Sequence, residues 1–169
     1  MTYECREATP ADLEALWAKN IARNPGDERW AAWREEYIGF NRSGLGRTFA
    51  ILCGGEPVGE GTLLFSPACS AIAGRLALAD GRTVANVNAL RIEKAHEGRG
   101  HMSRLVRMME EWAAARGYAR LTIGVDAAET RNLAIYLHWG YNEYVMAEEE
   151  DEILRAGPVL YYAKTLFPK

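Results

Sequence analysis

Residues 84–141 constrain the fold of this chain more than any other stretch. An apolar run, Val84–Ile92, leads through a glycine-containing turn, Glu97–Met102, directly into an amphipathic helix. A strand that enters a glycine turn and then a helix points several backbone N–H groups at one spot. The helix dipole adds partial positive charge there, which suits an anion. The sequence therefore predicts a phosphate-binding turn at the start of this helix.

The helix after the turn has the clearest periodicity in the chain. Its apolar residues recur at spacings of three and four: Met102, Leu105, Val106, Met109, Trp112 and Ala113. Arg116-Gly117 is typical of a helix end. The elements expected to follow are a strand at Leu121–Val125, a helix at Glu129–Trp139, and strands at Tyr144–Met146 and Val159–Lys164. The acidic run Glu148–Glu152 is expected to be a solvated loop.

The first half of the chain carries weaker signals. Thr9-Pro10 followed by Asp12 predicts a helix start with a capping box. The other elements expected are a strand at 3–7, a helix at Asp27–Phe40, a loop at Asn41–Gly46, and strands at Thr48–Cys53 and Val58–Phe65. Ser66–Gly81 is expected to be an irregular or hairpin insertion. The whole pattern indicates a single α/β domain.

Composition limits the functional classes. The chain has 169 residues and a formal net charge of −3, so no basic field favours nucleic acid, and the acidic balance mildly favours amine substrates. No apolar run approaches the ~20 residues needed to cross a bilayer, and the N-terminus lacks a secretory pattern. Three cysteines without C-x-x-C spacing, Cys5, Cys53 and Cys69, are expected to be reduced, structural thiols. These features predict a cytoplasmic protein without nucleic-acid or membrane partners.

The order of strand, glycine turn, helix, strand and tyrosine-bearing helix resembles the GCN5-related N-acetyltransferase (GNAT) family. The resemblance is specific over residues 84–164 and rests on element order alone before residue 48. It implies one domain over residues 1–169, with an acyl-CoA-binding core at 84–141 and a helical acceptor-side region at 1–47. The implied fold is a mixed, mostly antiparallel twisted sheet, splayed near its centre and flanked by helices.

The family's turn reads glutamine or arginine, two residues, glycine, one residue, then glycine or alanine. Here Glu97, Gly100 and Met102 fall on these marks, and only Gly100 matches. Glycine matters because a Cβ would block the approach of a diphosphate. A glycine-softened strand–helix connection without a ligand is the alternative interpretation of the turn.

The resemblance also implies a role for the preceding strand. Backbone groups of Leu90 and Ile92 would bind the pantetheine arm of acetyl-CoA as if it were an added strand. A plain core strand is the alternative, and both can hold. The residues expected to bind the cofactor are Leu90, Arg91, Ile92, Gly98, Arg99, Gly100, His101, Met102, Ser103 and Asn132.

A tyrosine is the expected general acid. The family segment reads asparagine, two residues, alanine, two residues, leucine, tyrosine, then a short run to glycine–phenylalanine. Glu129, Asn132, Ile135, Tyr136 and Gly140-Tyr141 fall on those positions, so Tyr136 matches the residue that would protonate the departing thiolate. Helix periodicity alone would make Tyr136 a core aromatic.

The general base is less clear in the sequence. The family often uses a carboxylate on the central strand, and the matching position holds Asn86, which accepts no proton at neutral pH. Glu60 on the preceding strand is the nearest candidate, although it also suits an exposed strand position. Alternatively, no protein base exists and the amine arrives neutral, with Asn86 and Asn88 lining the acceptor site.

The resemblance implies an enzyme that moves an acetyl group from acetyl-CoA to a primary amine by direct attack on the thioester. A small amine, an aminoglycoside-like antibiotic, a peptide N-terminus or a lysine all remain open as acceptors. The aromatic stripe Trp30, Trp33, Tyr37 and Phe40 suits a pocket wall, a core or a homodimer face.

Other chemistries find less support. A non-catalytic acyl-CoA-binding regulatory module is the rival, and a plain nucleotide-binding domain lacks its motifs. The histidines, His96, His101 and His138, show no metal spacing and are expected to be ordinary surface or capping residues.

Overall fold

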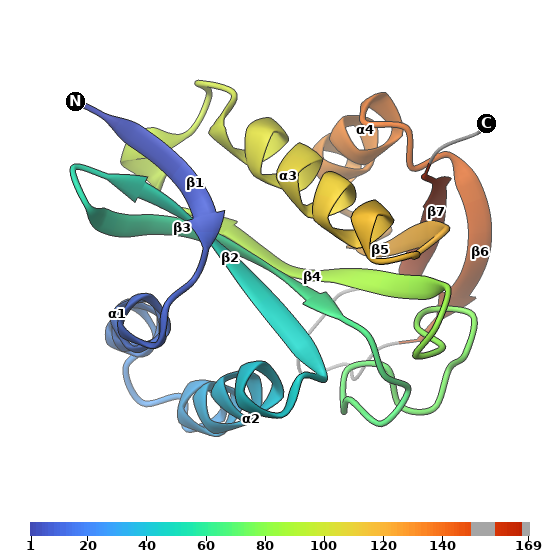
Figure 1. Cartoon of the computed structure of the whole chain (residues 1–169), viewed down its shortest axis with the longest axis horizontal. Coiled ribbons are helices and arrows are strands. Elements are labelled where there is room, and N and C mark those ends of the chain that lie inside the picture. Colours follow the sequence, from blue (N-terminus) through green and yellow to red (C-terminus); the bar gives the residue numbers. More distant parts are fainter. Residues whose placement is uncertain (150–157, 167–169) are drawn as a thin grey trace. The chain divides into compact units, whose positions relative to one another are not determined.

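Figure 1 shows the computed structural model of the chain, which describes residues 1–149 and 158–166. Within these residues lie β1 (Tyr3–Glu7), α1 (Pro10–Arg23), α2 (Arg29–Ser43), β2 (Gly46–Cys53), β3 (Glu56–Leu64), β4 (Val84–Ile92), a 3-10 turn (Lys94–His96), α3 (His101–Ala115), β5 (Arg120–Asp126), α4 (Thr130–His138), β6 (Glu143–Glu148) and β7 (Val159–Thr165). The strand order is β1-β2-β3-β4-β5-β7-β6, with β4 and β5 parallel. The pairs β1–β2, β2–β3, β5–β7 and β6–β7 are antiparallel, which confirms the predicted mixed sheet.

The chain divides into two compact units. The first comprises Met1–Leu64 and Ala89–Glu111, and the second comprises Phe65–Asn88 and Trp112–Lys169. The division passes through β4 and through α3, so each of these elements belongs partly to both units.

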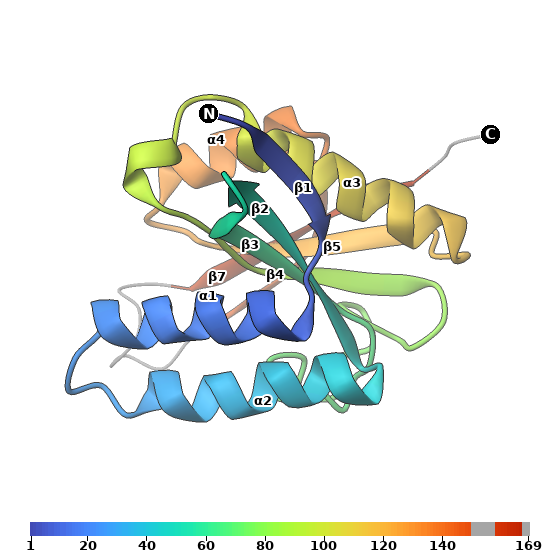
Figure 2. The same ribbon diagram turned by 60° about the vertical axis from the view of Figure 1, so that its left-hand side comes forward.

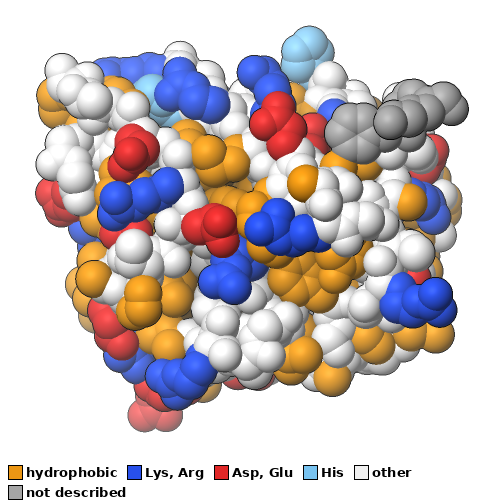
Figure 3. Space-filling model, viewed as in Figure 1, with side chains coloured by type: hydrophobic (Ala, Val, Ile, Leu, Met, Phe, Trp, Pro, Cys, Tyr) orange, Lys and Arg blue, Asp and Glu red, His pale blue; other side chains and the backbone are white. Residues whose placement is uncertain are grey.

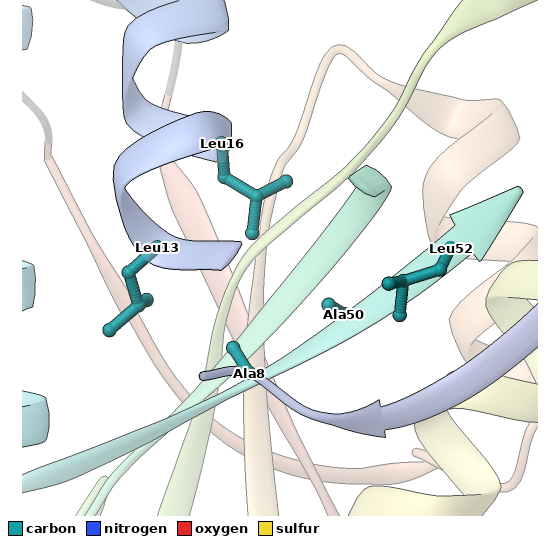
Figure 4. Packing of buried hydrophobic residues seen from close by; sticks show 5 residues of the cluster. All are labelled: Ala8, Leu13, Leu16, Ala50 and Leu52. Atoms are coloured by element: carbon teal, nitrogen blue, oxygen red, sulfur yellow. The ribbon is translucent and has the colours of Figure 1, made fainter. Parts of the chain in front are cut away.

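In the first unit, α1 and α2 lie side by side and pack against β3 and β2, respectively (Figures 1 and 2). The predicted capping box starts α1: the Asp12 N–H donates to Thr9 Oγ1 at 3.1 Å, and the Thr9 N–H donates to the Asp12 carboxylate at 2.9 Å. Leu13 and Leu16 of α1 then pack on Ala50 and Leu52 of β2 (Figure 4).

The two faces of β3 are covered by different helices. A Cβ on Gly61 would lie 2.7 Å from Leu90 Cδ2 and 3.0 Å from Met109 Sδ, so this face lies against α3. The neighbouring Glu60 is 2% exposed and meets Asn20 of α1 on the other face. Because side chains alternate along a strand, the glycine makes room for α3, and Glu60 is directed towards α1.

A left-handed residue interrupts β4. Ala89 has φ 54°, which is unusual for a residue with a Cβ and typical of a bulge. The parallel register with β5 covers Val84–Val87, before this residue. After it, Leu90 covers Gly61 on the α3 side, whereas the Arg91 guanidinium lies over the Trp17 ring of α1. This left-handed residue thus precedes Leu90 and Arg91, whose side chains lie on opposite faces of β4.

The second unit contains the β5–β7–β6 ladder, and α4 packs against β5. Residues 66–81 form turns rather than a hairpin, so the irregular alternative is correct. Asp80 ends this segment and accepts hydrogen bonds from the N–H groups of Arg82, Thr83 and Val84. This carboxylate fixes the chain where it enters β4.

Some predicted boundaries are wrong. Helix α2 runs from Arg29 to Ser43, so most of the expected loop Asn41–Gly46 is helical or belongs to β2. Gly44 ends the helix with φ 81°, and Asn41 Nδ2 donates to the Tyr37 carbonyl at 2.9 Å instead of breaking the helix. The acidic run Glu148–Glu152 lies largely outside the described residues.

Cys5, Cys53 and Cys69 form no disulfide bond with one another; Cys53 and Cys69 are buried, and Cys5 is half-buried. No helix in the described part of the chain is long and apolar enough to span a bilayer. On the face drawn in Figure 3, Lys and Arg side chains are interspersed with Asp and Glu, and neither sign gathers into one patch.

Candidate active site

The predicted phosphate turn is an exposed backbone structure at the N-terminus of α3. Gly98 and Gly100 have φ 73° and 79°, and a Cβ at either position would meet no atom within 4 Å. Glycine is therefore required here by the backbone conformation rather than by crowding within the protein. The open space beside a helix N-terminus is where an anion can approach the N–H groups.

One side chain of β1, that of Tyr3, contacts this turn. The Tyr3 ring stacks on His101 with centroids 3.9 Å apart, and the Tyr3 hydroxyl lies 2.8 Å from His96 Nδ1. Arg99 Nη1 also donates to this hydroxyl at 3.2 Å. Burial raises the pKa of Tyr3, and the nearby Arg99 opposes that effect. Tyr3 of β1 thus contacts two residues of the turn, Arg99 and His101, and His96 just before it.

His101 is buried, so its prediction as a surface or capping residue is wrong. Its ring is 6% exposed, and Arg104 Nη1 lies 3.4 Å from its Nδ1. The other ring nitrogen, Nε2, is buried and has no hydrogen-bond partner among the described residues. Burial lowers the pKa of His101, and the positive charges of Arg104, Arg99 and His96 lower it further.

The other residues expected to bind the cofactor differ in exposure. Leu90, Arg91, Ile92, Met102 and Ser103 are half-buried, whereas Arg99 is exposed. Glu97, the acidic departure from the family pattern, is exposed as well.

A second polar cluster lies on the α1 side of the sheet in the same unit. The Oε2 of Glu60 accepts hydrogen bonds from Asn20 Nδ2 at 2.9 Å and from Arg91 Nε at 3.3 Å. The Oε1 of Glu60 is buried without a hydrogen-bond partner among the described residues. The alternative of an exposed strand glutamate is therefore wrong, because Glu60 is 2% exposed. Buried carboxylate oxygens are costly to leave unpaired.

Two neighbouring indole rings, with centroids 6.5 Å apart, lie near the Arg91 guanidinium. The guanidinium carbon lies 5.3 Å from the Trp17 ring centroid and 5.2 Å from that of Trp30, distances that permit cation–π attraction. The Trp17 ring is buried at 1% exposure, and Trp30 is half-buried. We call Glu60, Arg91, Asn20, Trp17 and Trp30 the carboxylate cluster.

Ion pairs flank this cluster at the ends of α1 and β4. Lys19 Nζ lies 2.8 Å from Glu93 Oε2, and Arg23 Nη2 lies 3.0 Å from the same oxygen. Burial raises the pKa of Glu93, but the hydrogen bonds and charges of Lys19 and Arg23 outweigh it and lower the pKa.

Asn86 and Asn88 belong to the second unit. Asn86 is 2% exposed, and its Nδ2 donates to Thr122 Oγ1 at 3.0 Å. Asn88 Nδ2 donates to the Asn86 side-chain oxygen at 3.1 Å. The asparagine at the family's carboxylate position is thus a hydrogen-bonded residue within the sheet.

The tyrosine helix also lies in the second unit. Tyr136 is half-buried on α4, with its ring centroid 5.6 Å from that of Trp139. Asn132 is half-buried one turn earlier, and its Nδ2 donates to Glu129 Oε2 at 2.8 Å. The helix ends before Gly140, whose φ is 100°. The predicted segment therefore forms a helix with Tyr136 in its last half.

Comparison with known proteins agrees with this arrangement. Residues 6–141 match the model of the acetyltransferase (GNAT) family. A GNAT family acetyltransferase from Elizabethkingia anophelis with acetyl-CoA bound superposes with a TM-score of 0.64 at 13% identity, covering 97% of this chain and 98% of that chain. No curated protein sequence matched.

Two further solved structures have similar folds. The Salmonella typhimurium acetyltransferase that modifies the N-terminal serine of ribosomal protein L7/L12 has a TM-score of 0.70 and 17% identity, covering 99% of this chain and 96% of that chain. Aminoglycoside 6′-acetyltransferase type Ii has a TM-score of 0.70 and 19% identity, covering 100% and 99%.

The family match spans most of the chain and includes the turn, α3 and the tyrosine helix. The chain therefore belongs to the GNAT family. It is an N-acetyltransferase that uses acetyl-CoA as its acyl donor.

Sequence reasoning missed the residues that support the site. Tyr3, Asn20 and Trp17 were not expected near it, because each comes from an element whose position depends on tertiary packing. A signal for the direction of Glu60 was present in the sequence, however. Gly59 and Gly61 flank it, and glycines on one strand face indicate close packing on that face.

Proposed function

We propose that the protein acetylates a primary amine by direct attack on the thioester of acetyl-CoA, with Glu60 as general base and Tyr136 as general acid. Glu60 takes one proton from the incoming ammonium, and the neutral amine adds to the thioester carbonyl, forming the N–C bond. When the tetrahedral intermediate collapses, the C–S bond breaks and Tyr136 protonates the departing thiolate; the second proton on the nitrogen then replaces the one that Tyr136 gave. The observation that carries the proposal is the buried carboxylate of Glu60, whose Oε1 has no hydrogen-bond partner among the described residues.

The cofactor would be held mainly by backbone groups. The N–H groups around Gly98–Met102 would bind the diphosphate, with Arg99, His101 and Ser103 beside them. The backbone of Leu90, Arg91 and Ile92 would bond the pantetheine arm. The open space around Gly98 and Gly100, which are both exposed, supports this assignment. Asn132 would contact the cofactor arm from α4.

The roles of Glu60 and Tyr136 rest on different kinds of support. Glu60 already uses Oε2 to accept from Asn20 and Arg91, which leaves Oε1 for a proton or a bridging water. Tyr136 matches the position of the family's acid and is half-buried.

The setting of the reaction is also a proposal. Three cysteines without a disulfide bond fit a reducing compartment, which favours the cytoplasm. The acceptor would be a small-molecule or peptide amine rather than a nucleic acid or membrane component. The half-buried aromatic residues Trp30 and Trp33 of α2 suit a homodimer face. We treat residues 1–169 as one catalytic domain.

A thiol-release assay with acetyl-CoA and a broad panel of amines tests the reaction, and calorimetry tests cofactor binding separately. Tyr136→Phe removes only the hydroxyl and is expected to lower kcat about 100-fold with little change in CoA affinity. Unchanged turnover in this variant would show that Tyr136 is not the general acid and has only a packing role. Binding of CoA without thiol release for any amine would favour a non-catalytic acyl-CoA-binding module.

Glu60→Gln tests the base. The kcat/KM of the wild type should rise with pH through an apparent pKa that the variant loses. Measuring two acceptor amines of different pKa distinguishes deprotonation by Glu60 from the alternative, in which the amine binds already neutral. A profile that follows the amine and ignores the substitution would remove Glu60 from the mechanism.

A further inference from the structure

We propose that the Arg91 side chain selects acceptors whose reactive amine is accompanied by a carboxylate. The inference rests on the proposed function, and it names the class of acceptor. The backbone of Arg91 was assigned to the cofactor arm, whereas its side chain lies on the α1 face within the carboxylate cluster.

The guanidinium of Arg91 is held in place with part of its binding capacity unused. Its Nε donates to Glu60 Oε2 at 3.3 Å, which fixes one edge of the group. Neither Nη group has a hydrogen-bond partner among the described residues, and the side chain is 30% exposed. The edge that carries the Nη groups is therefore available to a solute.

Because the Arg91 guanidinium is already held in place, it should be more selective for carboxylates than the guanidinium of an ordinary surface arginine. Trp17 and Trp30 lie on the guanidinium at 5.3 Å and 5.2 Å, and they restrict its rotamers. A planar guanidinium binds a carboxylate through two parallel N–H···O bonds, which a lysine cannot reproduce. Because the arginine is already ordered, less conformational entropy is lost when the carboxylate binds.

The charges of the cluster also favour an acceptor that carries a carboxylate. The Glu60 carboxylate and the Arg91 guanidinium together are neutral. An acceptor with one ammonium and one carboxylate would keep the local charge balanced, with its ammonium near the base and its carboxylate on Arg91. A polycationic acceptor would instead bring further positive charge to a guanidinium, which is unfavourable. We therefore expect α-amino acids and amines of that kind to be preferred over polyamines and aminoglycosides.

Matched acceptor pairs test this inference directly. Free α-amino acids and their α-amides differ in the carboxylate, and their thiol-release rates are compared per concentration of neutral amine, because amides have more acidic ammonium groups. The wild type is expected to show a kcat/KM about ten- to hundredfold higher for the acids. A peptide arm, with an acidic or a neutral residue after the N-terminal amine, distinguishes a free amino acid from a peptide source.

Arg91→Lys keeps a positive charge beside Glu60 but removes the planar guanidinium that makes two parallel hydrogen bonds to a carboxylate. It should reduce the preference for acids to within about threefold, mainly by raising KM, while CoA still binds. Arg23→Lys is the matched control, because Arg23 pairs with Glu93 outside the cluster and should leave the preference unchanged. If Arg91→Lys does not fold, Arg91→Gln is the second variant; its side-chain amide can still donate a hydrogen bond to Glu60, and it should also lose the preference.

The outcomes separate the inference from the function on which it rests. Binding of CoA with equal or better turnover of amides or polycations overturns the role of Arg91 and leaves the acetyltransferase intact. Binding of CoA without turnover of any carboxylate-bearing amine also overturns it. Absence of both CoA binding and thiol release overturns the proposed function and the inference together.

Discussion

The phosphate turn and the carboxylate cluster lie in the same unit but are built in opposite ways. The turn exposes its backbone, and Gly98 and Gly100 contribute conformation rather than side chains. The carboxylate cluster buries its functional group, and every contact of Glu60 is made by a particular side chain. Backbone recognition tolerates substitutions at neighbouring positions, whereas side-chain recognition does not. This difference explains how the turn forms although Glu97 and Met102 depart from the family pattern.

The largest expected effect is on stability, when a glutamate is replaced by alanine in the carboxylate cluster and in the phosphate turn. Glu60→Ala leaves Arg91 and Asn20 without their buried acceptor, and should lower the free energy of unfolding by about 3 kcal/mol. Glu97→Ala removes an exposed carboxylate and should change it by less than about 0.5 kcal/mol. Urea denaturation of the two variants measures the difference. Equal losses would show that Glu60 is not a buried, paired group in solution.

Binding of CoA, in contrast to stability, should depend on the phosphate turn more than on the carboxylate cluster. CoA at a hundred times its Kd is expected to stabilise the wild type by about 2.7 kcal/mol. Gly100→Val should abolish this stabilisation, because the positive φ strains a valine and the added side chain would occupy the open space where an anion approaches. Thermal unfolding with and without CoA is the measurement.

Gly117→Val is the matched control for this prediction. Gly117 has φ 90° at the other end of α3, and a Cβ there would also meet no atom within 4 Å. Both variants should lose about 1–2 kcal/mol without ligand, but only Gly100→Val should lose the response to CoA. A full response in Gly100→Val would remove the turn from the cofactor site.

A smaller effect is expected from the contact between β1 and the turn. Tyr3→Phe removes the hydroxyl that bonds His96 and Arg99 but keeps the ring that stacks on His101. We expect a loss of about 1 kcal/mol in stability and a several-fold weaker binding of CoA by calorimetry, with kcat unchanged. A change in kcat without a change in CoA affinity would contradict this positioning role.

The smallest effect is a pH dependence of stability. Burial, with the charges of Arg104, Arg99 and His96, lowers the pKa of His101 in the folded state. As the pH falls from about 7 to about 5, the unfolded state takes up a proton before the folded state does, so the free energy of unfolding should decrease. His101→Gln should flatten this decrease, and His138→Gln, at an exposed position of α4, should not. Identical pH profiles for the wild type and His101→Gln would contradict it.

The fold was largely predictable because its strongest local signals agree with one another. Residues 84–92 are apolar and β-prone, and the structure forms β4 over the same range. The capping box at Thr9 and Asp12 is a local interaction, so it too could be predicted. The end of α2 could not, because Asn41 favours a loop by propensity, whereas in the structure its side chain bonds Tyr37 and Thr48.

The site was predictable where it depends on chain order. The glycine turn and the helix with Tyr136 follow from spacing along the sequence. The burial of His101 and of Glu60 could not be predicted, because it depends on Tyr3 and Asn20, which lie far away in the sequence.

Ala89 makes β4 intolerant of length changes. A slip of one residue reverses the face of every later side chain in a strand. Deleting Ala89 would remove the left-handed residue and exchange the directions of Leu90 and Arg91. The guanidinium would then enter the apolar space beside Met109, and a leucine would take its place beside Trp17 and Trp30. Point substitutions elsewhere in β4 alter one contact at a time, but this single deletion would disable the proposed acceptor selection and the core packing together.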